Sequence, residues 1–378
     1  MTLTHLNNSG DPRFRDAADL LEEGLRADAY TAAALLVGRG EDIIWEATAG
    51  FARPGSLFDI ASVTKPLTAA LFFLLCQEGS LAPDGHISTI LPFTSPDPRA
   101  REIQFIHLLS HTSGLPAWLP LYKKVLEEER ETGAKLYGTS EGYDMILADA
   151  LSLPLESDPA SAWEYSDLGY MILGRAIEAA GFKSLDRLLK KRLLQPLCMR
   201  DTGYFPCASE CEENARRVIP TGWSEERQRE KAGEADDENA AAMGGVAGHA
   251  GVFSTTSDLF LFARELLRAL RGEGRVFTRA SAAAMTTRVP APPGCPRTAG
   301  FDTPTAGKDG PSQAGALAPK DTVGHLGYTG CSLWIDPASE ITVVFLTNRV
   351  VYGSGNLKLS KLRPRIHDVV WKGMGLGL

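Results

Sequence analysis

The chain has 378 residues, of which 44% are hydrophobic and 23% charged, a composition typical of globular proteins rather than disordered, collagen-like or coiled-coil ones. The formal net charge of −8 would repel a phosphate backbone, and no basic stripe offsets it, so nucleic acid is not an expected partner. The longest apolar run, 69–76, is far shorter than the roughly 20 residues that span a bilayer, so no membrane association is expected.

The cysteines, the histidines and the first residues bear on location and on metals. Residues 1–13 are polar and contain no apolar segment that would direct secretion, so we expect a cytoplasmic location and reduced cysteines. Cys207 and Cys211 form a close pair, but they lack the further ligands of a four-coordinate zinc site. No H-E-x-x-H spacing occurs, so neither a metal nor another cofactor is expected.

Helix and strand patterns alternate at the start of the chain. Apolar residues recur at helical spacing over 14–27, which predicts an amphipathic helix. The runs 32–37 and 43–49 flank a glycine-rich turn and predict a hairpin of an antiparallel sheet. A second helix, apolar enough to be buried, is expected over 61–77 with Asp59 as its cap.

The middle of the chain, up to about residue 199, carries helix and turn patterns without a convincing strand. Helices are expected over 105–109, 124–131, 142–151, 167–180 and 185–194. The following stretch, 210–238, is polar and charged with few apolar residues. It is interpreted as a solvated excursion rather than a domain of its own.

Strand patterns return in the last third. A strand at 251–254, a helix over 258–270 and two strands at 332–335 and 341–347 are expected. The Pro- and Gly-rich segment 290–320 is predicted to form a lid or rim.

The elements together predict an α/β sandwich in one domain. An antiparallel sheet drawn from both ends of the chain, flanked by helices, would form an α/β subdomain of residues 1–78 and 240–378. An all-α subdomain, residues 79–239, would be inserted between them.

The segment Ser62-Val63-Thr64-Lys65 at the start of the second helix is an S-x-x-K string. Residues three apart share a helix face, so the amine of Lys65 can lie against the hydroxyl of Ser62, while free N–H groups of the first turn face a developing anion. Those are a nucleophile, a proton acceptor and half of an oxyanion hole. Pro66 has no N–H, so the helix is expected to be irregular at the serine.

Two further strings indicate no particular function when each is considered alone. Tyr165-Ser166-Asp167 precedes an apolar helix with Asp167 in the capping position. The run His325-Leu326-Gly327-Tyr328 is interpreted as leading into the strand at 332–335, where a glycine marks the close approach of a ligand or another backbone.

The three strings, in this order and at these separations, resemble the serine β-lactamase and penicillin-binding protein superfamily, class C-like branch. That branch also contains esterases, D-aminopeptidases and D-alanyl-D-alanine carboxypeptidases. Supporting strings are 109–115, similar to H-T-S-G-L, and 251–259, similar to G-x-x-S-T-x-x-D-L. The resemblance covers residues 32–347 and implies a β-lactamase-like fold.

The resemblance also implies residue roles. Ser62 would be acylated, and Lys65 and Tyr165 would move protons, with the choice of base left open. Backbone N–H groups of Ser62 and Tyr328 would hold the oxyanion. A buried lysine loses its proton more easily, and a phenol facing cations is expected to ionise more readily.

Departures from the class C pattern affect the substrate-binding residues, which by resemblance are Asp167, His325 and Gly327. Asp167 stands where those enzymes have Asn, and as a carboxylate it can pair with Lys65 and raise its pKa, or repel an anionic substrate. His325-Leu326-Gly327 stands where they have Lys-Thr-Gly, and a histidine is at most partly charged at pH 7. Our hypothesis is a small ester or peptide-like amide substrate, with weak or absent β-lactam hydrolysis.

Several other residues have competing interpretations. Ser140 lies in a G-x-S-x-G string, but no buried strand precedes it, so it is interpreted as a helix cap rather than a nucleophile elbow. His111 is expected to brace a loop rather than to take part in catalysis. The glycine-rich run 244–251 is interpreted as a tight connection near the site, with His249 as an alternative rim contact.

Two function classes remain. One is an active serine hydrolase that works through an acyl-enzyme. The other is a catalytically inactive relative that binds a ligand or partner in the same cleft. Ser62, Lys65 and Tyr165 together favour the enzyme, because a binding module does not need all three.

Overall fold

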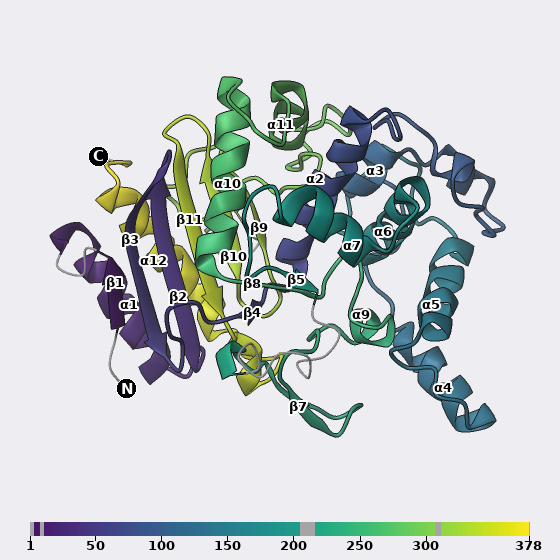
Figure 1. Cartoon of the computed structure of the whole chain (residues 1–378), viewed down its shortest axis with the longest axis horizontal. Helices are drawn as coiled ribbons and strands as arrows, with labels where there is room; N and C mark the ends of the chain where they lie inside the picture. The colour runs from purple at the N-terminus through teal and green to yellow at the C-terminus, as the bar shows by residue number, and fades with distance from the viewer. Residues whose placement is uncertain (1–3, 8–10, 205–215, 307–310, 378) are drawn as a thin grey trace.

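The computed structural model describes residues 4–7, 11–204, 216–306 and 311–377. Figure 1 shows a sheet-containing half beside a helix-rich half, with both termini next to the sheet. The expectation for Cys207 and Cys211 falls outside the described residues. None of the helices in the described ranges combines the length and apolar composition needed to cross a bilayer.

The main sheet has six strands in the order β1-β3-β2-β11-β10-β9, and every neighbouring pair is antiparallel. Its strands are β1 (Thr4–Asn7), β2 (Ala32–Arg39), β3 (Asp42–Gly50), β9 (Val323–Leu326), β10 (Ser332–Asp336) and β11 (Ile341–Thr347). Leu36 of β2 lies opposite Val344 of β11. The prediction of an antiparallel sheet drawn from both ends of the chain is therefore confirmed.

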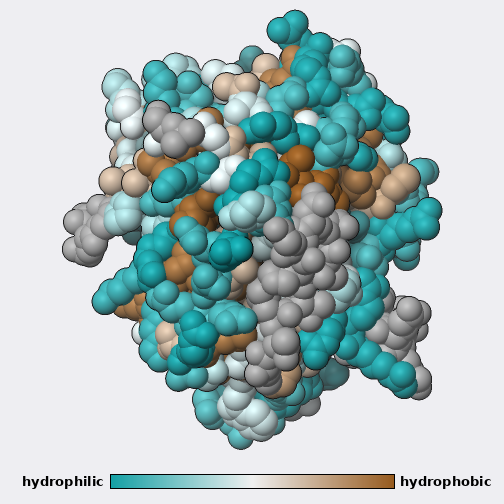
Figure 2. All heavy atoms as spheres, turned by 90° about the vertical axis from the view of Figure 1, so that its left-hand side faces the viewer, coloured by the Kyte–Doolittle hydropathy of each residue, from teal (hydrophilic) through white to brown (hydrophobic). Residues whose placement is uncertain are grey.

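Side chains of β2 alternate between two hydrophobic layers, because successive strand residues point to opposite faces. Leu35 and Val37 pack with the outer helices α1 (Arg15–Arg26) and α12 (Lys358–Gly373). Leu36 packs into the larger core beside α10 (Thr256–Arg271). Viewed from the side of α1 and α12, the surface is largely hydrophilic, with hydrophobic residues in separate small areas (Figure 2).

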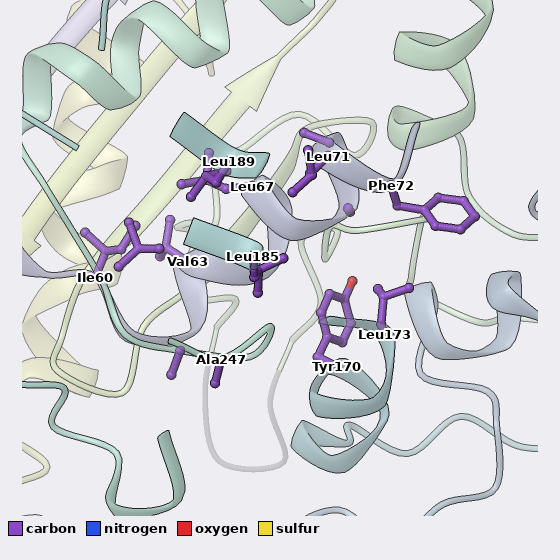
Figure 3. Close-up of a cluster of buried hydrophobic side chains, with 14 of the residues drawn as sticks. Ile60, Val63, Leu67, Leu71, Phe72, Tyr170, Leu173, Leu185, Leu189 and Ala247 are labelled. Atoms are coloured by element: carbon purple, nitrogen blue, oxygen red, sulfur yellow. The ribbon is translucent and has the colours of Figure 1, made fainter. Parts of the chain in front are cut away.

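The helix-rich half packs around α2 (Thr64–Gln77), which is buried over most of its length. Leu67 and Leu71 of α2 lie among side chains of the helices α6 (Asp167–Gly181) and α7 (Leu185–Leu189), including Leu173 and Leu185 (Figure 3). The other helices here are α3 (Phe105–Leu109), α4 (Tyr122–Thr132), α5 (Ser140–Ser152), α6 (Asp167–Gly181) and α7 (Leu185–Leu189), which continues as a π-helical turn over Lys190–Leu194. The predicted helices are thus present, with ends shifted by a few residues.

Short elements connect the two halves. A three-stranded sheet, β4-β8-β5, is made of Phe58–Asp59, Val252–Ser254 and Gly203–Tyr204. The described part of the stretch interpreted as a solvated excursion contains the hairpin β6 (Gly222–Ser224) and β7 (Arg229–Lys231), followed by α9 (Glu238–Ala242). That interpretation does not hold for the end of the stretch, because Asp236 is buried there and Asp237 contacts the buried His249.

The sequence patterns missed α11 (Arg279–Thr286), the outer helix α12, the edge strands β1 and β9, and the short elements β4, β5, β6, β7 and α9. Short 3-10 turns cover Pro12–Phe14, Ala61–Val63, Ile87–Thr89, Pro98–Glu102 and Arg349–Tyr352. The subdomain boundaries after residues 78 and 239 stay a prediction.

Candidate active site

The S-x-x-K segment enters α2 through a sharp turn. β4 ends at Asp59, and a 3-10 turn covers Ala61–Val63 before α2 begins. Ala61 has a φ of +47°, a left-handed conformation that L-residues with a side chain rarely adopt. Asp59 Oδ1 stabilises this conformation by accepting a 2.8 Å hydrogen bond from the Ala61 N–H. The predicted irregularity at Ser62 before Pro66 is confirmed.

The buried amine of Lys65 contacts three oxygen atoms. Nζ lies 3.0 Å from Ser62 Oγ and 3.0 Å from the carbonyl oxygen of His249. The third contact is an ion pair of 2.6 Å with Asp167 Oδ1. The structure therefore brings Ser62, Lys65 and Asp167 together, as the sequence predicts.

Burial lowers the pKa of Lys65, because an ammonium ion loses its hydration inside the protein. Asp167 and Asp237 oppose this effect, whereas the positive charge of Arg297 adds to it. The net pKa direction is downward, so the amine loses its proton more readily than an exposed lysine does.

Tyr165 reaches the site from the segment that leads into α6. Ser166 Oγ accepts a hydrogen bond from Gly169 N at 3.2 Å and caps this helix, so the prediction of Asp167 as the cap is wrong. Asp167 is instead turned towards the lysine. His111 Nδ1 accepts a 3.0 Å hydrogen bond from the Ser166 N–H, and its ring lies 4.5 Å from the Tyr165 ring. His111 thus braces this segment, as expected.

The phenol of Tyr165 behaves differently from the sequence-based expectation. Burial raises its pKa well above the usual value, and the charge of Asp167 raises it further. A hydrogen bond with Ser62 and the charge of Arg297 lower the pKa, but they do not outweigh burial. The expectation that the phenol ionises more readily is therefore wrong, and Tyr165 keeps its proton at neutral pH.

His325 lies on β9, a strand of its own, rather than at the entry to β10. Its Nδ1–H donates to the carbonyl oxygen of Leu326 at 2.8 Å, and its ring centroid lies 6.0 Å from that of Tyr165. Burial lowers the pKa of His325 well below its usual value. The histidine is neutral at pH 7 and brings no charge to the site.

Gly327 follows β9 and permits a close backbone approach. A Cβ at this position would lie 2.5 Å from the carbonyl oxygen of Ile60, closer than real Cβ contacts. Thr329 Oγ1 donates a 2.8 Å hydrogen bond to the carbonyl oxygen of Asp59. The turn after β9 is therefore held against the segment that precedes Ser62, and the predicted close approach at this glycine is confirmed.

Two backbone N–H groups lie on these adjoining turns. Within the described part of the chain, neither the N–H of Ser62 nor that of Tyr328 donates a hydrogen bond. Arg349 supports the second turn through a 2.9 Å hydrogen bond from Nε to the Tyr328 carbonyl oxygen. Unused N–H groups on clamped turns are the type of donor that stabilises an oxyanion.

The glycine-rich connection lies behind Lys65, as expected, but His249 is not a rim contact. Its side chain is buried, and Nε2 lies 2.9 Å from Asp237 Oδ1. Burial opposes ionisation of Asp237, but His249 and the Ala240 N–H outweigh it and lower the pKa of this carboxyl. The stretch interpreted as solvated thus ends in part of the site's buried wall.

Arg297 is a residue of the site that the sequence patterns missed. Its guanidinium lies 5.4 Å from the ring centroid of Tyr165 and 5.7 Å from that of Trp163. The available signal was the prediction that 290–320 forms a rim, but no motif marks the arginine within it. Asp237 was missed for the same reason.

The competing nucleophile lies elsewhere. Ser140 is exposed at the first turn of α5, where Thr139 is the cap, and no strand precedes it. It is therefore neither a cap nor an elbow. In the described residues no group of three or more His, Cys, Asp or Glu side chains is placed to hold a metal ion.

Comparisons with known proteins agree with this geometry. The Beta-lactamase family model matches residues 17–362. A protein of Escherichia coli strain K12 named "Putative D-alanyl-D-alanine carboxypeptidase" is 30% identical over 318 residues, which cover 79% of this chain and 70% of that protein.

Solved structures show the same fold at low identity. EstCE1, described as a hydrolase with promiscuous acyltransferase activity, is 21% identical with a TM-score of 0.69, covering 96% of this chain and 99% of its own. A penicillin-binding protein homologue from Caulobacter crescentus is 16% identical with a TM-score of 0.69, covering 99% and 100%. The match of the family model over most of the chain shows that this protein belongs to the beta-lactamase family of serine hydrolases.

Proposed function

We propose that the protein hydrolyses a small ester or peptide-like amide through an acyl-enzyme on Ser62. The observation that carries the proposal is the 3.0 Å contact of Ser62 Oγ with Nζ of a buried Lys65, whose pKa is lowered. A neutral amine at that distance accepts the hydroxyl proton as the oxygen attacks.

Acylation follows from these positions. Ser62 Oγ forms a bond to the substrate carbonyl carbon, its proton passes to Lys65 Nζ, and the carbonyl electron pair moves onto oxygen. The N–H groups of Ser62 and Tyr328 hold that oxyanion. When the carbonyl re-forms, the leaving group departs with a proton from Lys65, delivered directly or through Tyr165. A water then releases the acyl group by the same steps.

The opposite pKa directions assign the proton roles. The pKa of Lys65 is lowered and that of Tyr165 is raised, so Lys65 is the base and Tyr165 a protonated donor that relays. Hydrogen bonding of the phenol to Ser62 places it within reach of both transfers.

A neutral acyl group suits the rest of the site. His325 is neutral and supplies no charge to a substrate carboxylate, while Asp167 adds a negative wall beside Lys65. Gly327 keeps the β9 turn close to the serine. The names of the relatives, a carboxypeptidase and a hydrolase with acyltransferase activity, support esters and peptides as the substrate class.

The test compares turnover of p-nitrophenyl acetate and a penicillin by the wild type, Ser62→Ala and Ser140→Ala. We expect ester turnover that disappears in Ser62→Ala and survives in Ser140→Ala, which removes an exposed serine at the first turn of α5. Penicillin kcat/KM should be at least about a hundredfold below the ester value, since misplaced substrates lose about that factor. Ester turnover that persists without Ser62 contradicts the proposal.

A cytoplasmic location also stays a prediction. Fractionation of the source cells, followed by detection of the protein in each fraction, tests it directly.

A further inference from the structure

Arg297 is a cation of the site that belongs to none of its three sequence strings. Its side chain is 12% exposed, and its guanidinium packs against the rings of Tyr165 and Trp163 at the distances given above. Such a partly desolvated cation over an aromatic face is attracted to the ring and holds it in place.

The loop that carries Arg297 is built onto the edge of the main sheet. Thr298 N donates to the Phe301 carbonyl oxygen at 2.9 Å, which closes a turn. Asp302 and Gly324 of β9 then exchange two backbone hydrogen bonds of 2.7 and 2.9 Å. Asp302 also forms an ion pair with Arg297. The guanidinium therefore has a fixed position relative to β9 rather than that of a free surface arginine.

The charge of Arg297 reaches the groups that handle protons. It lowers the pKa of Lys65 and of Tyr165, in each case as a smaller effect than burial. It also adds to the burial that lowers the pKa of His111 and His325, both of which are neutral. Arg297 thus places a positive charge beside Tyr165 that, unlike the amine of Lys65, does not lose its proton during the reaction.

The other titratable groups near this assembly act in both directions. Asp167 and Asp237 favour the protonated lysine. The groups that face Arg297 itself are Tyr165, Tyr170, Cys295, Glu164 and its ion-pair partner Asp302.

We propose that Arg297 is a positioning residue of the serine-hydrolase site: its guanidinium orients the Tyr165 ring and supplies the fixed positive charge that the neutral His325 does not. This inference rests on the proposed function, in which Lys65 receives the proton of Ser62. The charge of Arg297 acts on Lys65 and Tyr165 through its electrostatic field and does not require contact with the substrate.

The experiment records pH profiles of kcat/KM for p-nitrophenyl acetate, which carries no carboxylate, in the wild type, Arg297→Gln and Arg297→Lys. Loss of the cation lets Lys65 hold its proton to higher pH, so the acidic limb of Arg297→Gln moves upward, by on the order of one pH unit. Arg297→Lys retains the charge without the planar stacking group, and its limb should return towards the wild-type position, with a lower kcat.

Arg13→Gln is the matched control, because the Arg13 guanidinium also packs over an aromatic ring, 5.4 Å from the Phe14 centroid, and Arg13 lies in the turn before α1, outside the site. The acidic limb of the kcat/KM profile should not move in this control variant. Thermal melting of each variant separates loss of fold from loss of charge.

Three outcomes overturn the inference. One is an Arg297→Gln variant whose kcat and acidic limb of kcat/KM equal those of the wild type. Another is a limb that moves equally in Arg13→Gln. The third is a rise in KM confined to carboxylate-bearing esters with the limb in place, which makes Arg297 a substrate contact instead. Failure of the proposed function is recognised separately, because wild-type Ser62 would then not react with a fluorophosphonate at any pH.

Discussion

Two sets of groups around the Lys65 side chain differ in what they offer its amine. The first set consists of oxygen acceptors, namely Asp167 and the carbonyl of His249, with Asp237 as a further negative charge. The second set consists of the Tyr165 ring, whose centroid lies 4.9 Å from Nζ, and Arg297, which packs against the same ring. The acceptors favour the ammonium form, whereas burial and the nearby cation favour the neutral amine.

The difference teaches that a buried lysine can be held firmly and still act as a base. The acceptors fix the position of Nζ beside Ser62, while burial and the charge of Arg297 lower its pKa. A site with acceptors alone would hold a permanent ammonium ion. A site with rings alone would leave the amine without a fixed position.

Removing the Lys65 amine removes the group on which both sets of neighbours act, so it should have the largest effect on activity. Lys65→Met fills a similar volume but offers no proton acceptor, so kcat/KM for p-nitrophenyl acetate should fall at least about a thousandfold. Lys65→Arg, which keeps a charge that does not deprotonate, should be equally inactive. Activity within tenfold of the wild type in either variant would assign the base elsewhere. Melting curves check that both variants fold.

Removing only the Tyr165 hydroxyl should reduce activity less, because the aromatic ring stays in place. Tyr165→Phe keeps the ring that both Lys65 and Arg297 contact but cannot relay a proton. We expect a loss of roughly a hundredfold in kcat with KM little changed, measured on esters with good and poor leaving groups. The loss should be greater for the poor leaving group, which needs a proton to depart, and an equal loss for both would remove Tyr165 from that step.

Neutralising an acceptor shifts the balance in the opposite direction from Arg297→Gln. In Asp167→Asn the ammonium form of Lys65 loses an anion, so the pKa of Lys65 falls further and the acidic limb of kcat/KM moves to lower pH, by about one unit or more. Asp167→Glu keeps the charge and serves as the control. A limb that moves upward in Asp167→Asn contradicts the account of the acceptors around the lysine.

Asp59 is buried next to the turn that carries Ser62, and its effect should be on stability more than on rate. Burial, with repulsion from Asp236, raises the pKa of Asp59 from 3.8 to about 7. Because the folded state then binds the proton more tightly than the unfolded chain, this contribution stabilises below about pH 4 and is lost as pH rises through about 7. Its full size is at most about 4 kcal/mol.

Urea unfolding between pH 4 and 8 measures that contribution as the difference between the wild type and Asp59→Asn. The wild-type advantage should shrink steadily as pH rises. A difference that does not depend on pH would show that Asp59 titrates alike in the folded and unfolded states.

Local patterns predicted most of the fold. The hairpin β2–β3 and the helices α2 and α6 have clear periodicity, because each buries one face against a neighbouring layer. The edge strand β9 was missed, since it is only four residues long and includes Gly324. The outer helix α12 was missed although it buries Ile366 and Trp371, because Pro364 and interspersed basic residues obscure its pattern.

The site residues also fall into those that a local sequence pattern marks and those that no local pattern marks. Ser62 and Lys65 are three residues apart in one string, so their contact follows from helix geometry. Arg297 and Asp237 reach the site from loops whose course depends on the whole fold, and no local pattern marks them. The direction of the Tyr165 pKa was mispredicted because burial, which outweighs the cations, becomes visible only in the folded chain.

The central claim is that Ser62 is the acylated nucleophile. Intact-mass spectrometry of the wild type after reaction with a fluorophosphonate, followed by peptide mapping, tests it most directly. The account predicts a single adduct on the peptide containing Ser62, absent in Ser62→Ala and retained in Ser140→Ala. No adduct on the wild type, or an adduct that persists in Ser62→Ala, would contradict it.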